Sequence, residues 1–175
     1  MELNELRHDC ARRQKKGLHF IITSVVIWGL ILATQFLDLP LGQKNLVVFC
    51  CSAVLFPLAL LASKILHIDF QSKDNPLTGL AILVSLNQLV YILIAMWAFA
   101  EAPEKMLMIY AMIFGAHLMP FSWLYRSPAY LVFSLVIPIV SLVLGVLLPP
   151  FATALFVFVA EIVFSCCLAA ECKKL

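Results

Sequence analysis

The sequence predicts an all-α integral membrane protein, a bundle of six transmembrane helices joined by short loops. Of its 175 residues, 63% are apolar and only 13% are charged, and the mean hydropathy is +1.02. A soluble domain is about half apolar and about a quarter charged, and a water-exposed chain as apolar as this one would aggregate through large surface patches. A spanning helix needs about 20 apolar residues, so the length allows six spans in one membrane domain, residues 1–175, without a linker.

Six apolar runs predict the transmembrane helices. They cover residues 18–37, 45–65, 77–100, 105–124, 129–148 and 151–170. The first run is too long for the apolar part of a signal peptide, so we expect it to remain as a span. The weakest break is the pair Pro149 and Pro150, but the apolar stretch around it is too long for one crossing and proline interrupts helical hydrogen bonding. We therefore expect a tight hairpin at this point.

Residues 1–16 form a polar arm that changes from acidic to basic along its length. Glu5, Asp9 and Arg13 follow one another at steps of four, which favours a short helix. Four cations close the arm directly before the first span: Arg12, Arg13, Lys15 and Lys16. Cations at such a position contact anionic lipid headgroups, so we expect a membrane-surface anchor. The alternative, a tail that binds nucleic acid, fits the adjoining span less well.

The distribution of lysine and arginine predicts the orientation, because cytoplasmic loops of membrane proteins carry an excess of both. With the N-terminus inside, only Lys44 and Lys105 of the 12 Lys and Arg residues lie on the outer side. An odd number of spans would also move the basic tail, Lys173 and Lys174, to the outer side. We therefore expect a multi-pass protein of the cell (inner) plasma membrane with both termini in the cytoplasm.

One charged residue falls deep inside a span. Glu161 lies ten residues into the sixth run, about 15 Å along it. A charged side chain at the bilayer centre costs about 3 kcal/mol or more. Residues of this kind face the bundle interior, pair with another group or stay protonated, since burial disfavours the charged form of a carboxyl.

Other polar residues lie at a similar depth. At a rise of about 1.5 Å per residue, a histidine, two amides and two tyrosines of the third and fourth spans come within about two turns of the level of Glu161. Together they predict a midplane substrate or proton site: Glu161, His117, Asn87, Gln88, Tyr91 and Tyr110. A Glu–His pair exchanges protons near neutral pH, and amides bind or orient a solute. The alternative is that these groups bond helix to helix and only stabilise packing. Three polar residues near span ends are interpreted as interfacial: His19, Gln35 and His67.

Two prolines suggest a symmetry between the halves of the chain. Pro57 interrupts the second span and Pro138 the fifth, while Asn87 and Glu161 lie equally far into the third and sixth. Three helices in each half would make this an inverted 3+3 repeat, a design that recurs in transporters with a midplane site. Coincidence within apolar sequence is the alternative.

The short motifs in the sequence concern packing more than chemistry. Small residues at a spacing of four, Ala111 with Gly115 and Ser141 with Gly145, favour close helix contact or dimerisation. The six cysteines include no CxxC and the histidines no HxxxH, so neither a metal nor another cofactor is predicted. The lack of HExxH and GxSxG argues against a membrane-embedded enzyme, which remains a lesser alternative.

Residues 3–28 contain the segment LRHDCARRQKKGLHFIITSVVIW. This start resembles small bacterial polytopic membrane proteins of an uncharacterised family, and the resemblance extends over the whole chain by length and number of spans. It implies the six-span fold and no catalytic residue. The size also resembles the vitamin-binding membrane subunits of energy-coupling-factor transporters, although Ser24 and Trp28 stand where that family has an AxxxA pattern.

Three functions are consistent with these observations. The first is a small-solute or proton-coupled transporter or permease that uses the midplane cluster. The second is an accessory or sensor protein that binds a partner membrane protein, or a second copy, through its helices and its basic arm. The third is a substrate-binding subunit of a larger transporter. The first requires Glu161, whereas the second requires residues 1–16.

Overall fold

The computed structural model describes residues 2–70 and 72–175, and within them the chain is entirely helical and turn. The elements are α1 Leu3–Arg13, η1 Lys15–Gly17, α2 Leu18–Gln35, α3 Leu41–Ala53, α4 Leu55–Ile65, α5 Pro76–Glu101, η2 Pro103–Lys105, α6 Met106–Ala116, α7 Met119–Leu124, α8 Pro128–Leu147 and α9 Pro150–Cys172. The predicted all-α fold is therefore confirmed. So is the short helix of the polar arm, which is α1.

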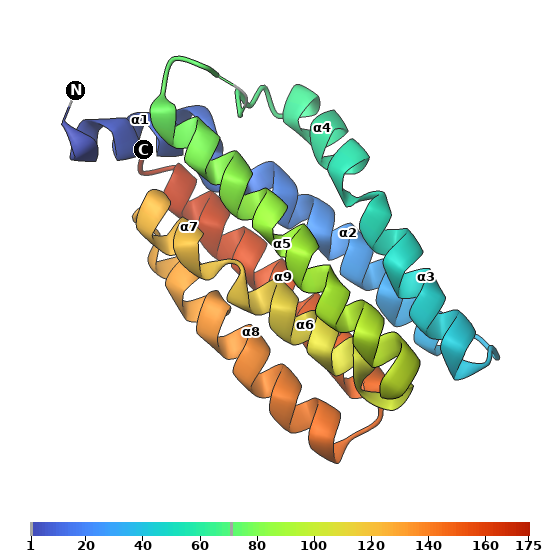
Figure 1. Ribbon diagram of the computed structural model, residues 1–175. Helices are drawn as coiled ribbons and strands as arrows, with labels where there is room; N and C mark the ends of the chain where they lie inside the picture. The colour runs from blue at the N-terminus through green and yellow to red at the C-terminus, as the bar shows by residue number, and fades with distance from the viewer. Residues whose placement is uncertain (1, 71) are drawn as a thin grey trace.

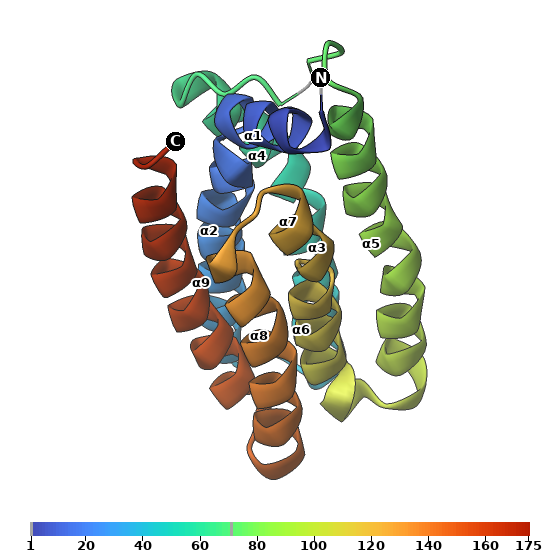
Figure 2. The ribbon, with the colours of Figure 1, turned by 90° about the vertical axis from the view of Figure 1, so that its left-hand side faces the viewer.

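Six helical segments are long and apolar enough to cross a bilayer. They are Lys15–Gln35, Leu41–Ile65, Pro76–Glu101, Pro103–Leu124, Pro128–Leu147 and Pro150–Cys172. Each apolar run of the sequence lies on one of them, and the double proline forms the turn between α8 and α9. Both termini lie at the same end of the bundle, as an even number of crossings requires (Figures 1 and 2).

The spanning helices pack in a definite lateral order. Four helices pack side by side in the order α2, α9, α8 and α6. α4 packs against α2, and α5 packs against α6. α4 and α5 thus stand at the two ends of the order, with little direct contact between them (Figure 1). Aromatic side chains fill the core: Trp28 lies 5.6 Å from Phe114, and Phe164 lies 4.9 Å from Tyr130, between ring centroids. The space between α4 and α5 is where the candidate site lies.

Two of the six segments are broken near their middle. The second breaks at Val54, before Pro57, and the fourth at His117 and Leu118, before Pro120. Proline cannot donate the backbone hydrogen bond that would continue the helix. The helix around Pro138, in contrast, is continuous. The breaks therefore lie in the second and fourth segments. An inverted repeat would instead pair the second segment with the fifth, which is continuous. The inverted repeat stays a prediction.

Small residues bring α6 and α8 into close contact. A Cβ added at Gly115 would lie 2.5 Å from Cδ of Pro138 and 2.8 Å from Cβ of Ile137, and one added at Gly145 would meet Met108. Ala111 and Ser141 are also completely buried. The two small-residue spacings thus serve contact between helices of one chain.

Replacing Gly115 with alanine should destabilise the protein. The new methyl group would overlap the rigid ring of Pro138, and overpacking of this kind costs about 1–3 kcal/mol. The matched control is Gly79→Ala in α5, where nothing lies within 4 Å of the added Cβ, so alanine should be neutral or stabilise the helix by up to about 1 kcal/mol. Unfolding in mixed micelles measures both free energies, and equal effects would contradict the close contact.

Candidate functional site

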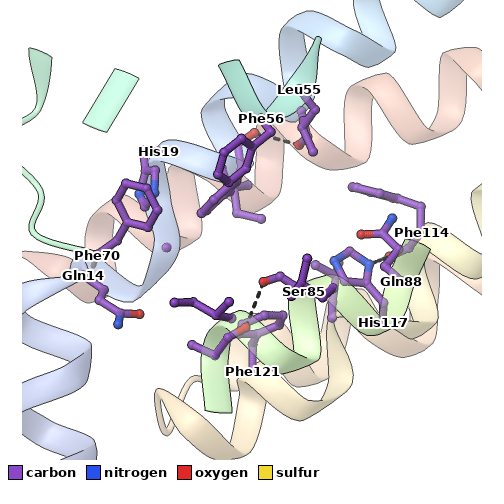
Figure 3. Close-up of a pocket in the computed structure, with 18 of the residues that line it drawn as sticks. Gln14, His19, Leu55, Phe56, Phe70, Ser85, Gln88, Phe114, His117 and Phe121 are labelled. Carbon is purple, nitrogen blue, oxygen red and sulfur yellow. Dashed lines mark hydrogen bonds between the residues drawn. The ribbon is translucent and has the colours of Figure 1, made fainter. Parts of the chain in front are cut away.

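A cavity of about 430 Å³ lies between α2, α4, α5 and the α6–α7 pair (Figure 3). Its walls are mainly apolar and rich in aromatic rings, and the connection from α1 to α2 and the loop before α5 add residues at one end. The polar side chains in the walls are Gln14, His19, Ser24, Ser52, Ser85, Gln88 and His117, with the hydroxyls of Tyr125 and Tyr130. None of the described residues that line it is an Asp, Glu, Lys or Arg. The cavity is thus an uncharged space within the spanning part of the bundle.

His19 is the most enclosed polar group of the cavity. Its side chain is 0% exposed, and neither ring nitrogen has a hydrogen-bond partner among the described residues. Gly17, with a left-handed φ of 71°, turns the chain from α1 into α2, and Phe70 packs on the imidazole at 4.9 Å between centroids. His19 does lie near the end of its span, but its ring faces the interior and not the headgroups, so its interfacial interpretation is wrong.

Glu161 does not line the cavity itself and is separated from it by the side chain of Ser24. It is completely buried, and Oε2 hydrogen-bonds with the hydroxyl of Ser24, which does line the cavity. Oε1 has no partner among the described residues, and no Lys, Arg or His of the described chain lies within ion-pair distance. Sequence reasoning found Glu161 but missed Ser24, because a serine in an apolar helix carries no sign of what it faces.

His117 and Gln88 both line the cavity, as the midplane hypothesis requires of them. His117 occupies the break between α6 and α7, where Nδ1 hydrogen-bonds with the carbonyl of Phe114. Figure 3 shows His117 and Gln88 at one end of the cavity and His19 with Phe70 at the other. Tyr110 is buried behind the wall.

A pair of hydroxyls connects Tyr110 to the cavity in the way that Ser24 connects Glu161. The Tyr110 hydroxyl hydrogen-bonds with that of Ser52 at 2.5 Å, and Ser52 lines the cavity beside the break in the second segment. Four of the six predicted site residues are thus at the cavity or one hydrogen bond from it.

Asn87 and Tyr91 lie away from the cavity. Both are on the exposed face of α5, and the Tyr91 side chain is 43% exposed. The cavity-lining residues of α5 are those at positions 81, 82, 85, 86, 88 and 89. At about 100° per residue these positions share one face of the helix, and Asn87 falls on the opposite face. Tyr91, one turn after Asn87, shares its face. Counting residues along a span gives the depth of a side chain but not the direction in which it points around the helix axis. Asn87 and Tyr91 therefore do not belong to the group of predicted residues at the cavity.

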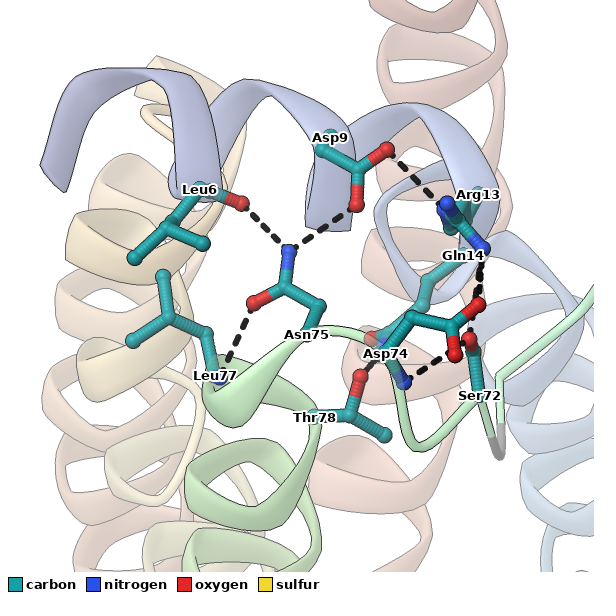
Figure 4. A network of polar contacts seen from close by, with 9 residues as sticks. All are labelled: Leu6, Asp9, Arg13, Gln14, Ser72, Asp74, Asn75, Leu77 and Thr78. Atoms are coloured by element: carbon teal, nitrogen blue, oxygen red, sulfur yellow. Dashed lines mark hydrogen bonds and ion pairs between the residues drawn. The ribbon is translucent and has the colours of Figure 1, made fainter. Parts of the chain in front are cut away.

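A polar network holds α1 across the end of the bundle where both termini lie (Figures 2 and 4). Asn75, at the start of α5, donates to the carbonyl of Leu6 at 2.8 Å and to Asp9 at 3.0 Å, while its oxygen accepts from the backbone of Leu77. Arg13 donates to Asp9 at 2.9 Å and to Asp74 at 3.3 Å. The arm is therefore docked on the bundle.

The network reaches the cavity through Gln14. Its amide donates to the hydroxyl of Thr78 at 3.3 Å, and its carbonyl oxygen accepts from Tyr125 at 2.6 Å. Gln14 and Tyr125 both line the cavity. The end of the arm is thus part of the wall.

Most of the cations expected at the membrane surface also make contacts within the protein. Lys16 is buried and pairs with Glu171 at 2.8 Å. Lys15 donates to the carbonyl of Leu66 at 2.7 Å, and Arg13 belongs to the network above. Arg12 is exposed. Contact of the arm with lipid headgroups stays a prediction.

Replacing Asp9 with asparagine should weaken the docking of α1 in a pH-dependent way. Hydrogen bonds from Arg13 and Asn75 hold the pKa of Asp9 below its ordinary value. The ionised carboxylate therefore stabilises the folded state above the ordinary pKa of about 4, and the contribution is lost as the pH falls through the lowered value. The thermal unfolding midpoint of the wild type should exceed that of Asp9→Asn near neutral pH and converge with it below about pH 4.

The control for this titration is Glu104→Gln, at an exposed position in η2. It should leave the unfolding midpoint unchanged across the same range. A difference between wild type and Asp9→Asn that persists undiminished at about pH 2 would contradict the ionic role of Asp9.

Comparison with known proteins bears on the family alone. Searches of curated proteins and of solved structures give no match. The sequence model of a family of unknown function (DUF7010) matches residues 3–171, nearly the whole chain. The resemblance to an uncharacterised family is thereby confirmed, and the protein belongs to this family of unknown function.

Proposed function

We propose that the protein binds a small solute in the cavity and moves it across the bilayer with a coupled proton. The observation that carries this proposal is the uncharged cavity of about 430 Å³ inside the spanning bundle, with hydrogen-bonding groups at both of its ends. Small-molecule sites are typically apolar pockets of about 300–1,000 Å³ with a few placed polar groups, and this one has that character.

The two helix breaks support movement of the walls. Ser52, Ala53 and Leu55 flank the first break and His117 and Leu118 form the second, and all of them line the cavity. Discontinuous helices at a central site are a recurring feature of transporters, because broken segments can move separately and expose backbone groups to a solute. We propose that the chain bends at these two breaks and so opens the cavity to the solute.

The proton would be carried by Glu161. Its carboxyl is completely buried and communicates with the cavity through the Ser24 hydroxyl. Ionisable residues inside a membrane domain are costly and typically mark ion or substrate pathways. A solute in the cavity that changes the hydrogen bond of Ser24 would change how well Glu161 holds its proton.

Glu161→Gln should abolish solute-driven proton movement while the protein still folds. Vesicles containing the purified protein and a trapped pH-sensitive dye are exposed to a panel of neutral, cationic and anionic small molecules. At least one solute should change the internal pH in wild-type vesicles by at least about tenfold more than in Glu161→Gln vesicles, and Ser24→Ala should have an intermediate effect.

The matched control is Glu101→Gln, which removes an exposed carboxyl at the end of α5 and should leave the flux unchanged. A normal rate in Glu161→Gln would remove Glu161 from the mechanism. A panel in which no solute moves a proton would exclude the coupled transport proposed here.

An accessory or sensor function is the second candidate, favoured by the position of α1. Gln14 belongs to the cavity wall and is hydrogen-bonded to Thr78 and Tyr125, so a bound solute could alter how the arm is held. A sensor of this kind would act without Glu161 but would require a docked arm. We propose a non-enzymatic role in either case.

We further propose that the protein resides in the cell (inner) plasma membrane with both termini in the cytoplasm. The Lys and Arg residues concentrate at the end of the bundle that holds the termini, which the excess of positive charge in cytoplasmic loops favours. A green fluorescent protein fused after Leu175 should fluoresce, and alkaline phosphatase fused there should be inactive. The opposite pair of results would reverse the orientation.

A further inference from the structure

We infer that the ligand of the cavity is an uncharged, planar aromatic molecule with one hydrogen-bonding group, and that His19 recognises this group. The inference rests on the proposed function in one respect only, because it takes the cavity as the solute site. It concerns what binds, and stands whether or not transport follows.

The charge of the lining sets the charge of the ligand. A charged ligand inside a bundle would lose its hydration and would need an opposite charge in compensation. The described lining contains no acidic or basic side chain except its two histidines. Neither Glu161 nor Lys16 belongs to the lining. Glu161 lies behind the wall and hydrogen-bonds with Ser24 through Oε2 only, and Lys16 is paired with Glu171. An uncharged ligand is therefore favoured.

The geometry of His19 provides the hydrogen-bonding position. A neutral imidazole offers one donor and one acceptor, and in His19 both are completely buried and have no partner among the described residues. A buried polar group without a partner is unfavourable, and a ligand that supplies one recovers that free energy. His117 is different, because its Nδ1 is already engaged with the carbonyl of Phe114.

The rings around His19 set the shape of the ligand. Phe20 and Phe70 lie 4.4 and 4.9 Å from the imidazole between centroids, and Phe20 and Phe70 meet edge to face at 5.7 Å. Phe56 extends this set on α4, 6.5 Å from Phe20. Aromatic rings favour offset-stacked or edge-to-face contact with another ring. A flat aromatic body placed among these three side chains would bring its polar group to His19, beside which Figure 3 shows Phe70.

Indole is a probe that carries both features, a planar ring system and one N–H donor. Equilibrium binding to the full-length protein in lipid nanodiscs, corrected with empty nanodiscs, is compared with two relatives of indole. 1-Methylindole lacks the donor, and indole-3-acetate is an anion. Indole should bind at least about tenfold more tightly than either.

Substitution of His19 tests the recognition directly. His19→Phe keeps the ring and removes both hydrogen-bonding atoms, so indole binding should fall about tenfold to the level of 1-methylindole. His19→Gln, which keeps a donor and an acceptor, should retain part of the affinity. His8→Phe, at an exposed position in α1, is the matched control and should bind like the wild type.

A measurement on the unaltered protein covers the case in which His19→Phe fails to fold. The protein has four histidines and can be labelled with ¹⁵N-histidine. Indole should then shift the NMR resonances of His19 and leave those of His8 and His67 unchanged. Indole that binds without moving the His19 resonances, or indole-3-acetate that binds as tightly as indole, overturns the inference. Absence of indole binding also overturns it.

The outcomes separate this inference from the proposed function. Proton flux driven by a charged solute, without indole binding, would refute the ligand class and leave transport standing. Indole binding that depends on His19, without flux for any solute, would support the ligand class and refute transport.

Discussion

The structure depends on one constraint: a chain inside a bilayer must satisfy its own backbone and buried polar groups, because lipid offers no hydrogen bonds. Helices satisfy the backbone, which explains why all six spanning segments are helical. The same constraint makes each unpaired polar atom in the interior conspicuous. His19 and Oε1 of Glu161 are such atoms among the described residues, and both belong to the same region of the bundle.

The cavity results from the lateral order in which the helices pack. α2, α9, α8 and α6 form a closely packed sequence, with Gly115 allowing α6 to approach α8. α4 and α5 are carried at its two ends and leave space between them. Because the second and fourth segments are broken beside this space, its walls contain both helix breaks described above. The proposed solute site and the proposed hinges of the helices would then lie at the same place in the bundle.

Depth along a helix can be counted in residues, and it was enough to select Glu161, His117, Gln88 and Tyr110, which lie at the cavity or one hydrogen bond behind it. Rotation about the helix axis was not predicted, because the spans are apolar on all sides and lack the polar face that orients a helix in water. For that reason depth alone predicts Asn87 to join Gln88 although it faces outward, and predicts His19 to be interfacial although it lines the cavity.

The sequence by itself determined the fold class, the number of spans, their approximate ends and the short helix of the arm, because these depend on hydropathy and on local spacing. Only the tertiary structure decided which side chains meet. The pairing of Ser24 with Glu161, the docking of α1 through Asn75, and the enclosure of His19 by Phe70 each join residues far apart in the chain or on different elements. Such contacts depend on how helices rotate and cross, and these are set by packing in three dimensions.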